Sequence, residues 1–382
     1  MEILGCTFTV LQVVFIGFLG VSMVIQWFYY FVFYARTAFH KTATETGSGH
    51  PEPVSVIICA RNEAQNLENH LPVILEQDYP DFEVIVVDDR STDNTPEILE
   101  RYKKKYPGLV TSRVNDDAKL VSSKKLAQTL GIKAAKNDLL VLTDADCAPV
   151  SSLWLRKMQA QFHLDTEIVL GYGGYRKRRG FLDKLIRYDT LFTAMQYLSF
   201  AKAGIPYMGV GRNLAYRKTL FLRNKGFASH SHIASGDDDL FINETARRKN
   251  TRICIDKESK TLSLPETTFS GWVKQKRRHL TTGKLYKPKH KFLLFLEPFS
   301  RVGFYASGIA LLLILNYPLN LFAGAIFLFR TIIQQIIIKK NMNRLQESDL
   351  LLYSLPLDFI LPWMIFIFSG INIFGLKETE WK

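Results

Sequence analysis

The stretch Leu139–Cys147, "LLVLTDADC", places Asp144 and Asp146 at the end of an apolar run. In an extended chain, residues i and i+2 point to the same side, so the two carboxylates are expected to converge. Converging negative charges repel each other unless a cation lies between or beside them. The alternative is a polar strand end in which one aspartate caps the following helix. The stretch alone leaves both interpretations open.

Two other apolar runs end in polar clusters in the same way. Val54–Ala60 ("VSVIICA") is followed by "RNE", and Phe82–Asp89 ("FEVIVVDD") is followed by "RSTD". Helical spacing separates these runs, and near-continuous apolar strands alternating with helices predict a mostly parallel sheet covered on both faces, the α/β class. Ligands bind at the carboxyl ends of such strands. We therefore expect the three polar clusters to meet in one site.

Several common sites are disfavoured by missing motifs. No G-x-G-x-x-G follows the first strand and no G-x-x-x-x-G-K-[ST] occurs, which argues against dinucleotide and P-loop sites. The four cysteines, Cys6, Cys59, Cys147 and Cys254, lack C-x-x-C spacing, so neither a zinc site nor a disulfide framework is expected. A phosphate ligand would then need a divalent cation held by carboxylates to neutralise it.

The ends of the chain are apolar enough to enter a membrane. No charged residue occurs from Ile3 to Ala35, which exceeds the roughly 20 residues needed for one span. Further apolar zones cover 299–338, broken by "NYP", and 350–374, preceded by the basic "KKNMNR". We expect one N-terminal and about three C-terminal transmembrane helices. From the distribution of positive charges, we expect a multi-pass protein of the cell (inner) membrane with its central part in the cytoplasm.

This pattern predicts three regions: an N-terminal anchor over 1–41, a cytoplasmic domain over 42–298 and C-terminal membrane helices over 299–382. The formal net charge of +13 fits a domain that lies on an anionic leaflet. Nucleic-acid binding would use the same charge, but no motif supports it, so no nucleic-acid partner is expected. Arg330 and Asp358 lie at similar depth, roughly 12 Å at 1.5 Å per residue, which suggests an ion pair between helices or a polar spot for a lipid acceptor head.

The central segment resembles the family-2 glycosyltransferases, which are inverting enzymes with a GT-A fold. The resemblance rests on "VSVIICARNEAQNLENHL", "VIVVDDRSTDNTPEIL", "LVLTDADCAP", "SGDDDLF" and "WVKQKRRHL", in family order over about residues 53–283. It implies a hexosyltransferase that uses Mg²⁺ or Mn²⁺ and a nucleoside-diphosphate sugar, with a UDP-sugar favoured. The implied acceptor is a lipid-linked or envelope glycan at the membrane.

The resemblance also implies roles for individual residues on the donor side. The nucleotide-sugar would contact the strand-end residues and a lysine that matches the family's K-x-x-A-L-N-x-G, namely Ala60, Arg61, Glu63, Asp88, Asp89, Lys124 and Asp144. The metal would bind Asp146 and Asp144, with Asp146 the more direct ligand. A solvated helix start remains the alternative for Arg61 and Glu63, and Lys125 is expected to be solvated.

On the acceptor side, Asp238 would be the general base and Asp237 its neighbour. Crowding in the run 237–239 should raise some of the carboxyl pKa values. The alternative is an acidic turn that caps the next helix. The resemblance places four further residues near the acceptor or the diphosphate: Gly211, Asn213, Gln275 and Arg278.

His279 occupies the position of the family's usual tryptophan, which argues against a processive polysaccharide synthase, the first rival interpretation. A catalytically degenerate scaffold is the second. The segment 175–192 mixes basic and aromatic residues, which is typical of a helix at the membrane surface or over the site, or of an ordinary packing helix.

Overall fold

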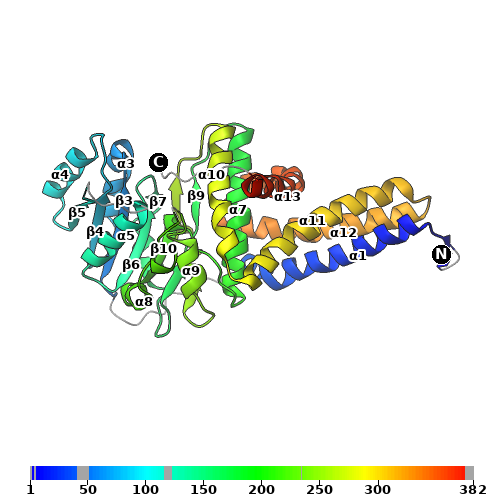
Figure 1. Cartoon of the computed structure of the whole chain (residues 1–382), viewed down its shortest axis with the longest axis horizontal. Helices are drawn as coiled ribbons and strands as arrows, with labels where there is room; N and C mark the ends of the chain where they lie inside the picture. Colours follow the sequence, from blue (N-terminus) through cyan, green and yellow to red (C-terminus); the bar gives the residue numbers. More distant parts are fainter. Residues whose placement is uncertain (1, 4–5, 41–50, 116–122, 234, 375–382) are drawn as a thin grey trace. The chain divides into compact units, whose positions relative to one another are not determined.

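The computed structural model describes residues 2–3, 6–40, 51–115, 123–233 and 235–374. The chain forms two compact units (Figure 1). The helical unit comprises Met1–His40 and Lys287–Gly375, and the α/β unit comprises Lys41–Tyr286 with Leu376–Lys382.

A seven-stranded sheet in the order β11-β8-β10-β6-β3-β4-β5 forms the centre of the α/β unit. The neighbours β6, β3, β4 and β5 are parallel, as the alternating pattern predicts, whereas β10 is antiparallel to both of its neighbours. The strands of this sheet are β3 Val54–Ala60, β4 Phe82–Asp88, β5 Leu109–Arg113, β6 Leu139–Asp144, β8 Ile168–Leu170, β10 Leu214–Arg217 and β11 Thr251–Ile253. The mostly parallel sheet of the predicted fold class is confirmed.

Alternate residues of each strand face opposite sides of the sheet, so their contacts show which helices cover each side. The even-numbered residues of β3, such as Val56 and Ile58, belong to a core shared with helices α3, α4 and α6. The odd-numbered Ile57 faces α5, because a Cβ added at Gly131 of that helix would lie 2.9 Å from its side chain. Both faces of the parallel strands are therefore buried, which explains their continuous apolar sequence.

Eight helices of the described residues surround this sheet: α3 Ala64–Leu75, α4 Thr95–Lys105, α5 Ser123–Ala134, α6 Trp154–Gln159, α7 Phe181–Lys202, α8 Lys218–Arg223, α9 Asp239–Thr245 and α10 Phe269–Thr282. A second, three-stranded sheet contains β7 Ala148–Pro149, β12 Thr261–Ser263 and β9 Gly173–Tyr175. Helix α7 is buried along most of its length, which favours the packing-helix interpretation of 175–192. It lies beside α10, where the ammonium of Lys276 is 2.6 Å from the carboxylate of Asp189 (Figure 1).

Among its described residues, the helical unit contains four long helical segments. Helix α1 (Val10–Phe28) begins with a capping box formed by Thr9 and Gln12, and it continues through the π-helical Tyr29–Tyr34 into α2 (Ala35–Ala38). The remaining helices are α11 Pro288–Ile314, α12 Leu319–Leu345 and α13 Leu351–Phe374, and a short hairpin pairs β1 Glu2–Ile3 with β2 Cys6–Thr7. The "NYP" sequence separates α11 from α12, as predicted.

Three helices among the described residues are long and apolar enough to cross a membrane: Val10–Ala38, Leu319–Leu345 and Ser348–Asn372. Two of the three C-terminal helices thus qualify, one fewer than expected. Helix α11 falls short because it carries charged residues such as Glu297 and Arg301. The basic "KKNMNR" sequence lies in the last turns of α12 instead of in a loop.

A buried polar network joins the membrane-type helices. The guanidinium of Arg330 lies 3.8 Å from the carboxylate of Asp358, so these charges of α12 and α13 do meet. Arg301 of α11 is nearer, at 2.8 Å from Asp358 and 2.7 Å from Glu297. Gln26 of α1 accepts a 2.5 Å hydrogen bond from Arg330. The predicted pair is therefore part of a network of two arginines and two carboxylates, all of them buried.

Candidate active site

Asp144 and Asp146 lie together, but not in the way that an extended strand predicts. Strand β6 ends at Asp144, and the chain turns there, with the N–H of Cys147 donating to the carbonyl of Asp144 at 3.0 Å. The expectation of an extended pair was wrong because the strand ends before it reaches Asp146. The turn still brings ligand atoms of Asp144, Asp146 and Cys147 within 4.8 Å of one another.

This acidic corner suits a hard divalent cation. Both aspartates are partly exposed, and carboxylate oxygens are the ligands that Mg²⁺ and Mn²⁺ prefer. Ser263 of β12 donates a 2.6 Å hydrogen bond to Oδ2 of Asp146 and so orients its carboxylate. Burial raises the pKa of the Cys147 thiol, which keeps it protonated and a poor ligand. The two carboxylates therefore fit the expected metal, and the thiol does not.

Lys124 of α5 connects this corner to the acidic run. Its Nζ lies 3.2 Å from Asp144 and 3.0 Å from Asp237. Burial opposes the ammonium charge, but the carboxylates of Asp144 and Asp237, followed by Asp238, outweigh burial and raise the pKa of Lys124 well above its usual value. Burial would likewise raise the pKa of Asp237, yet the ammonium of Lys124 holds it below its usual value. An ammonium held in this position can neutralise part of a diphosphate.

Asp238 has the environment expected of a general base. It is the N-cap of α9, and its two carboxylate oxygens accept backbone hydrogen bonds from Asp239 at 2.7 Å and Gly211 at 2.6 Å. Burial first, and then the negative charges of Asp237 and Asp239, raise the pKa of Asp238 to about 7. A carboxylate whose pKa lies near neutrality can accept a proton efficiently at physiological pH.

The third acid of the run, Asp239, has a different place. Its carboxylate accepts hydrogen bonds from the hydroxyl of Thr282 and, at 2.6 Å, from the hydroxyl of Tyr286. Its other oxygen accepts from the N–H of Leu240 at 2.8 Å. These partners tie α9 to the end of α10 and the turn after it. The three acids thus face different partners, and Asp239 acts as an internal anchor.

Hydrogen bonds join the segments that follow β3 and β4, and these segments form one side of the site. Asn62 and Arg90 follow these strands and both adopt left-handed backbone conformations, with φ of 55° and 56°. The Asn62 side chain accepts from the N–H of Thr92 at 2.8 Å, and Ser91 accepts from the N–H of Asn62 at 2.9 Å. Non-glycine residues rarely adopt this conformation unless their surroundings hold them there, and such positions cluster at functional sites.

Asp88 and Asp89 lie on this side of the site, and each has a carboxylate oxygen that could accept a further hydrogen bond. Asp89 is fully buried, and its Oδ1 accepts from Arg90 at 3.1 Å. Its Oδ2 is buried and accepts no hydrogen bond among the described residues, and neither does Oδ2 of Asp88, which lies 3.8 Å from the guanidinium of Arg113. A buried carboxylate oxygen without a donor is costly. Donors on a bound nucleoside would satisfy these two atoms.

The remaining donor-side residues lie at the same edge. Ala60 is buried, and its carbonyl accepts from the N–H of Asp89 at 2.7 Å. Arg61 and Glu63 are partly exposed, as a ligand contact or a helix start would require. Burial raises the pKa of Glu63, the hydrogen bond from Asn66 opposes the rise, and the charges of Asp146 and Asp144 add to it. The side chain of Glu63 is therefore close enough to the acidic corner to be influenced by its charges.

Gly211 and Asn213, which the resemblance places near the acceptor or the diphosphate, have different surroundings. Gly211 lies against Asp238, and a Cβ added there would be 3.4 Å from its Oδ2. Asn213 is completely buried and donates to the carbonyls of Tyr172 at 3.0 Å and Ser259 at 2.7 Å. Trp154 donates to its side-chain oxygen at 3.1 Å. This burial favours a structural role for Asn213 over the acceptor contact that the resemblance implied.

The Q-x-x-R segment lies on α10. Gln275 accepts a 3.4 Å hydrogen bond from the hydroxyl of Tyr175, the last residue of β9 in the second sheet. Arg278 is partly exposed, so it remains available to a ligand, and His279 is exposed. The second sheet also carries Ser263, which bonds Asp146. Gln275 is thus joined through Tyr175 to the sheet that supports the acidic corner.

Some residues near the site were not expected from the sequence. The guanidinium of Arg212 lies 4.4 Å from the ring centre of Tyr175. The backbone carbonyl of Arg212 accepts hydrogen bonds from the hydroxyls of Thr143 at 3.0 Å and Thr261 at 2.8 Å. Lys125 is buried, contrary to expectation, and donates to backbone carbonyls. The basic residue within "VGRN" was the only sequence signal for Arg212, and "KK" gave no indication of which lysine faces the site.

Comparison with known proteins identifies the central domain. The family model described as Glycosyl transferase family 2 matches residues 55–223. Glycosyltransferase AglE of Haloferax volcanii is 34% identical over 106 residues, which are 27% of this chain and 33% of that protein. Poly-beta-1,6-N-acetyl-D-glucosamine synthase of Staphylococcus epidermidis is 27% identical over 129 residues, 34% of this chain and 30% of that protein. These alignments span about a third of each relative.

A solved structure shows the same fold over nearly the whole chain. The mannosyltransferase PcManGT from Pyrobaculum calidifontis, in complex with GDP-Man and Mn²⁺, superposes with a TM-score of 0.56 at 20% sequence identity. The superposition covers 91% of this chain and 99% of that one. The expected GT-A type fold is thereby confirmed. Residues 55–223 of this chain are a glycosyl transferase family 2 domain.

Proposed function

We propose that the chain is a metal-assisted, inverting glycosyltransferase that moves a hexose from a nucleoside-diphosphate sugar to a membrane-associated acceptor. One observation carries the proposal: Lys124 lies within 3.2 Å of both Asp144 and Asp237. Lys124 therefore joins the acidic corner (Asp144 and Asp146) to the acidic run (Asp237–Asp239), although the two groups are far apart in the sequence. The buried Oδ2 atoms of Asp88 and Asp89, which accept no hydrogen bond among the described residues, support a nucleoside at the other side of the site.

Each part of the site has a task in this reaction. Asp89 and Asp88 accept hydrogen bonds from the nucleoside, and Lys124 neutralises part of the diphosphate. Asp144 and Asp146 would hold the divalent cation, which would supply charge stabilisation for the departing nucleoside diphosphate. Arg278 is an additional bidentate donor toward the diphosphate. Asp238 removes the proton from the acceptor hydroxyl, and a single base on the face opposite the leaving group yields inversion.

The acceptor is proposed to be a lipid-linked or envelope glycan. Three candidate membrane spans support an enzyme that works at a bilayer. Arg36 at the end of the first span and Lys41 after it, with the basic end of α12, support a cytoplasmic position of the catalytic domain, taken as residues 42–298, at the cell (inner) membrane. No nucleic-acid partner is proposed.

The donor can be found by binding. Calorimetry on the detergent-purified chain would titrate UDP- and GDP-sugars with and without Mn²⁺ or Mg²⁺. GDP-mannose belongs in the set because the structural neighbour was solved with it. We expect one donor to bind only when the metal is present. The Asp146→Asn variant should lose this metal-dependent binding. The exposed Asp165→Asn is the matched control. Equal or absent binding of every donor, with and without metal, would contradict the proposal.

A further inference from the structure

Two adjacent lysines near the start of α5 point in different directions. Lys124 reaches Asp144 and Asp237, whereas Lys125 is only 4% exposed and reaches backbone carbonyls. The Nζ of Lys125 donates to the backbone carbonyls of His230 at 2.7 Å and Ile233 at 2.9 Å. Consecutive helical residues lie about 100° apart around the axis, so one turn of α5 can serve both places.

The carbonyls that Lys125 binds belong to the segment leading into the acidic run. Only three residues separate Ile233 from Asp237. Gly236, just before the run, has φ of +93°, and a Cβ there would lie 2.4 Å from the side chain of Leu240. The downstream end of this segment is thus fitted closely against α9. Its upstream end is held by hydrogen bonds from Lys125.

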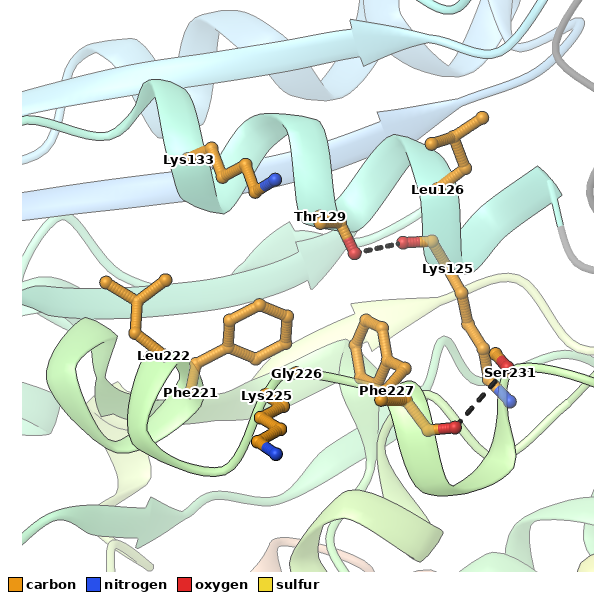
Figure 2. Close-up of a pocket in the computed structure, with 11 residues that line it drawn as sticks. Lys125, Leu126, Thr129, Lys133, Phe221, Leu222, Lys225, Gly226, Phe227 and Ser231 are labelled. Carbon is orange, nitrogen blue, oxygen red and sulfur yellow. Dashed lines mark hydrogen bonds between the residues drawn. The ribbon is translucent and has the colours of Figure 1, made fainter.

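Packing between α5 and the residues that precede this segment is incomplete. A cavity of about 390 Å³ lies between α5 and residues 221–231, and the side chain of Lys125 extends from α5 toward the Ser231 end of it (Figure 2). The cavity is lined by apolar groups such as Phe221 and Phe227, together with Lys133 and Lys225. Burial lowers the pKa of Lys125 to about 8, although the negative charges of Asp237, Asp239 and Asp238 oppose the fall. An apolar side chain would be less costly here, so the carbonyl bonds account for a lysine.

We infer that Lys125 is a positioning residue for the general base. By holding the carbonyls of His230 and Ile233 to α5, it fixes the segment that aims Asp238, while Lys124 on the same helix turn holds Asp237. The role is distinct from that of Lys124 because Lys125 donates to the backbone carbonyls of His230 and Ile233, whereas Lys124 pairs with the carboxylates of Asp144 and Asp237. This inference rests on the proposed transferase function. It predicts that loss of the carbonyl bonds impairs the chemical step more than donor binding.

The test uses the full chain with Lys125→Met, which keeps the length of the side chain but removes its donors. Lys133→Met, an exposed lysine of the same helix and cavity, is the matched control. We expect Lys125→Met to lower kcat by roughly 10-fold or more, with donor KM within about twofold, because small misplacements of a catalytic group are costly. Lys125→Arg, which retains N–H donors, should recover most of the activity.

Hydrogen exchange provides a readout that does not need turnover. In Lys125→Met, peptides covering 228–241 should exchange faster, while peptides from β3 and β4 stay as in the wild type. Wild-type exchange in 228–241, or wild-type kcat, would overturn the inference. So would faster exchange throughout the sheet, since that would show a general structural role. If the wild type itself transfers no sugar, the proposed function fails, and the exchange in 228–241 still decides whether Lys125 holds this segment.

Discussion

The raised pKa of Asp238 predicts how the reaction depends on pH. Asp238 must be ionised to accept a proton, and burial with the charges of Asp237 and Asp239 raises its pKa to about 7. The ionised fraction is then about 9% at pH 6 and about 91% at pH 8, so kcat/KM should rise about tenfold across this interval. A carboxyl with its ordinary pKa would already be ionised at pH 6, and the rate would not change.

The assay is the initial rate of nucleoside diphosphate release at an acceptor concentration well below its KM, measured as kcat/KM for the donor from pH 5.5 to 8.5. This quantity reports the ionisation of the free enzyme, which is the state that the structure describes. Asp238→Asn should lower the rate by about 10²- to 10⁴-fold and remove the rising limb. Donor affinity, measured separately by calorimetry, should change little over the same range.

Two results would refute this reasoning. A flat kcat/KM between pH 6 and 8 would show that no base with a pKa near 7 acts in the free enzyme. A rising limb that persists in Asp238→Asn would assign the ionisation to another group. Asp165→Asn, an exposed aspartate of the same unit, should retain both the wild-type rate and the wild-type profile.

Further predictions concern other parts of the chain. Lys124→Met removes a cation that lowers the pKa of Asp238, so the limb of the pH profile should move to higher pH, and an unmoved limb would contradict the geometry. Arg301→Met leaves Asp358 without its nearest cation and should cost about 3–5 kcal/mol, measured by thermal unfolding in detergent, and a loss below about 1 kcal/mol would show that the network contributes little. Asn213→Ala removes buried hydrogen bonds and should lower the free energy of unfolding by about 2–4 kcal/mol, whereas the exposed Asn69→Ala should not.

The parallel sheet was predictable because its strands are buried on both faces. Continuous apolar runs such as Val54–Ala60 and Leu139–Leu142 are typical of such strands, and both runs form strands in the structure. The polar residues that follow them had to meet, since parallel strands end at one edge. What the runs could not show is the local backbone. Asp146 lies in a turn because β6 ends at Asp144, and a spacing of two residues does not distinguish the two conformations.

The directions in which individual side chains point could not be predicted from the sequence. Lys124 and Lys125 are identical in type, and only the orientation of α5 determines which one meets the carboxylates. Asn213 is polar and lies close to Gly211 in the sequence, yet its amide is bonded to the backbone and to Trp154. The charges of Arg330 and Asp358 were matched in depth from the sequence, but the closer partner, Arg301, depends on how the helices pack.

The central claim is that the acidic corner and the acidic run act together in sugar transfer. The most direct test measures nucleoside diphosphate release from the chosen donor by detergent-purified wild type, Asp146→Asn and Asp238→Asn, with Mn²⁺ present or removed by a chelator. We predict metal-dependent release in the wild type, loss of metal-dependent release in Asp146→Asn, and intact donor binding without release in Asp238→Asn. Release that is unaffected by the chelator and by both substitutions would contradict the account.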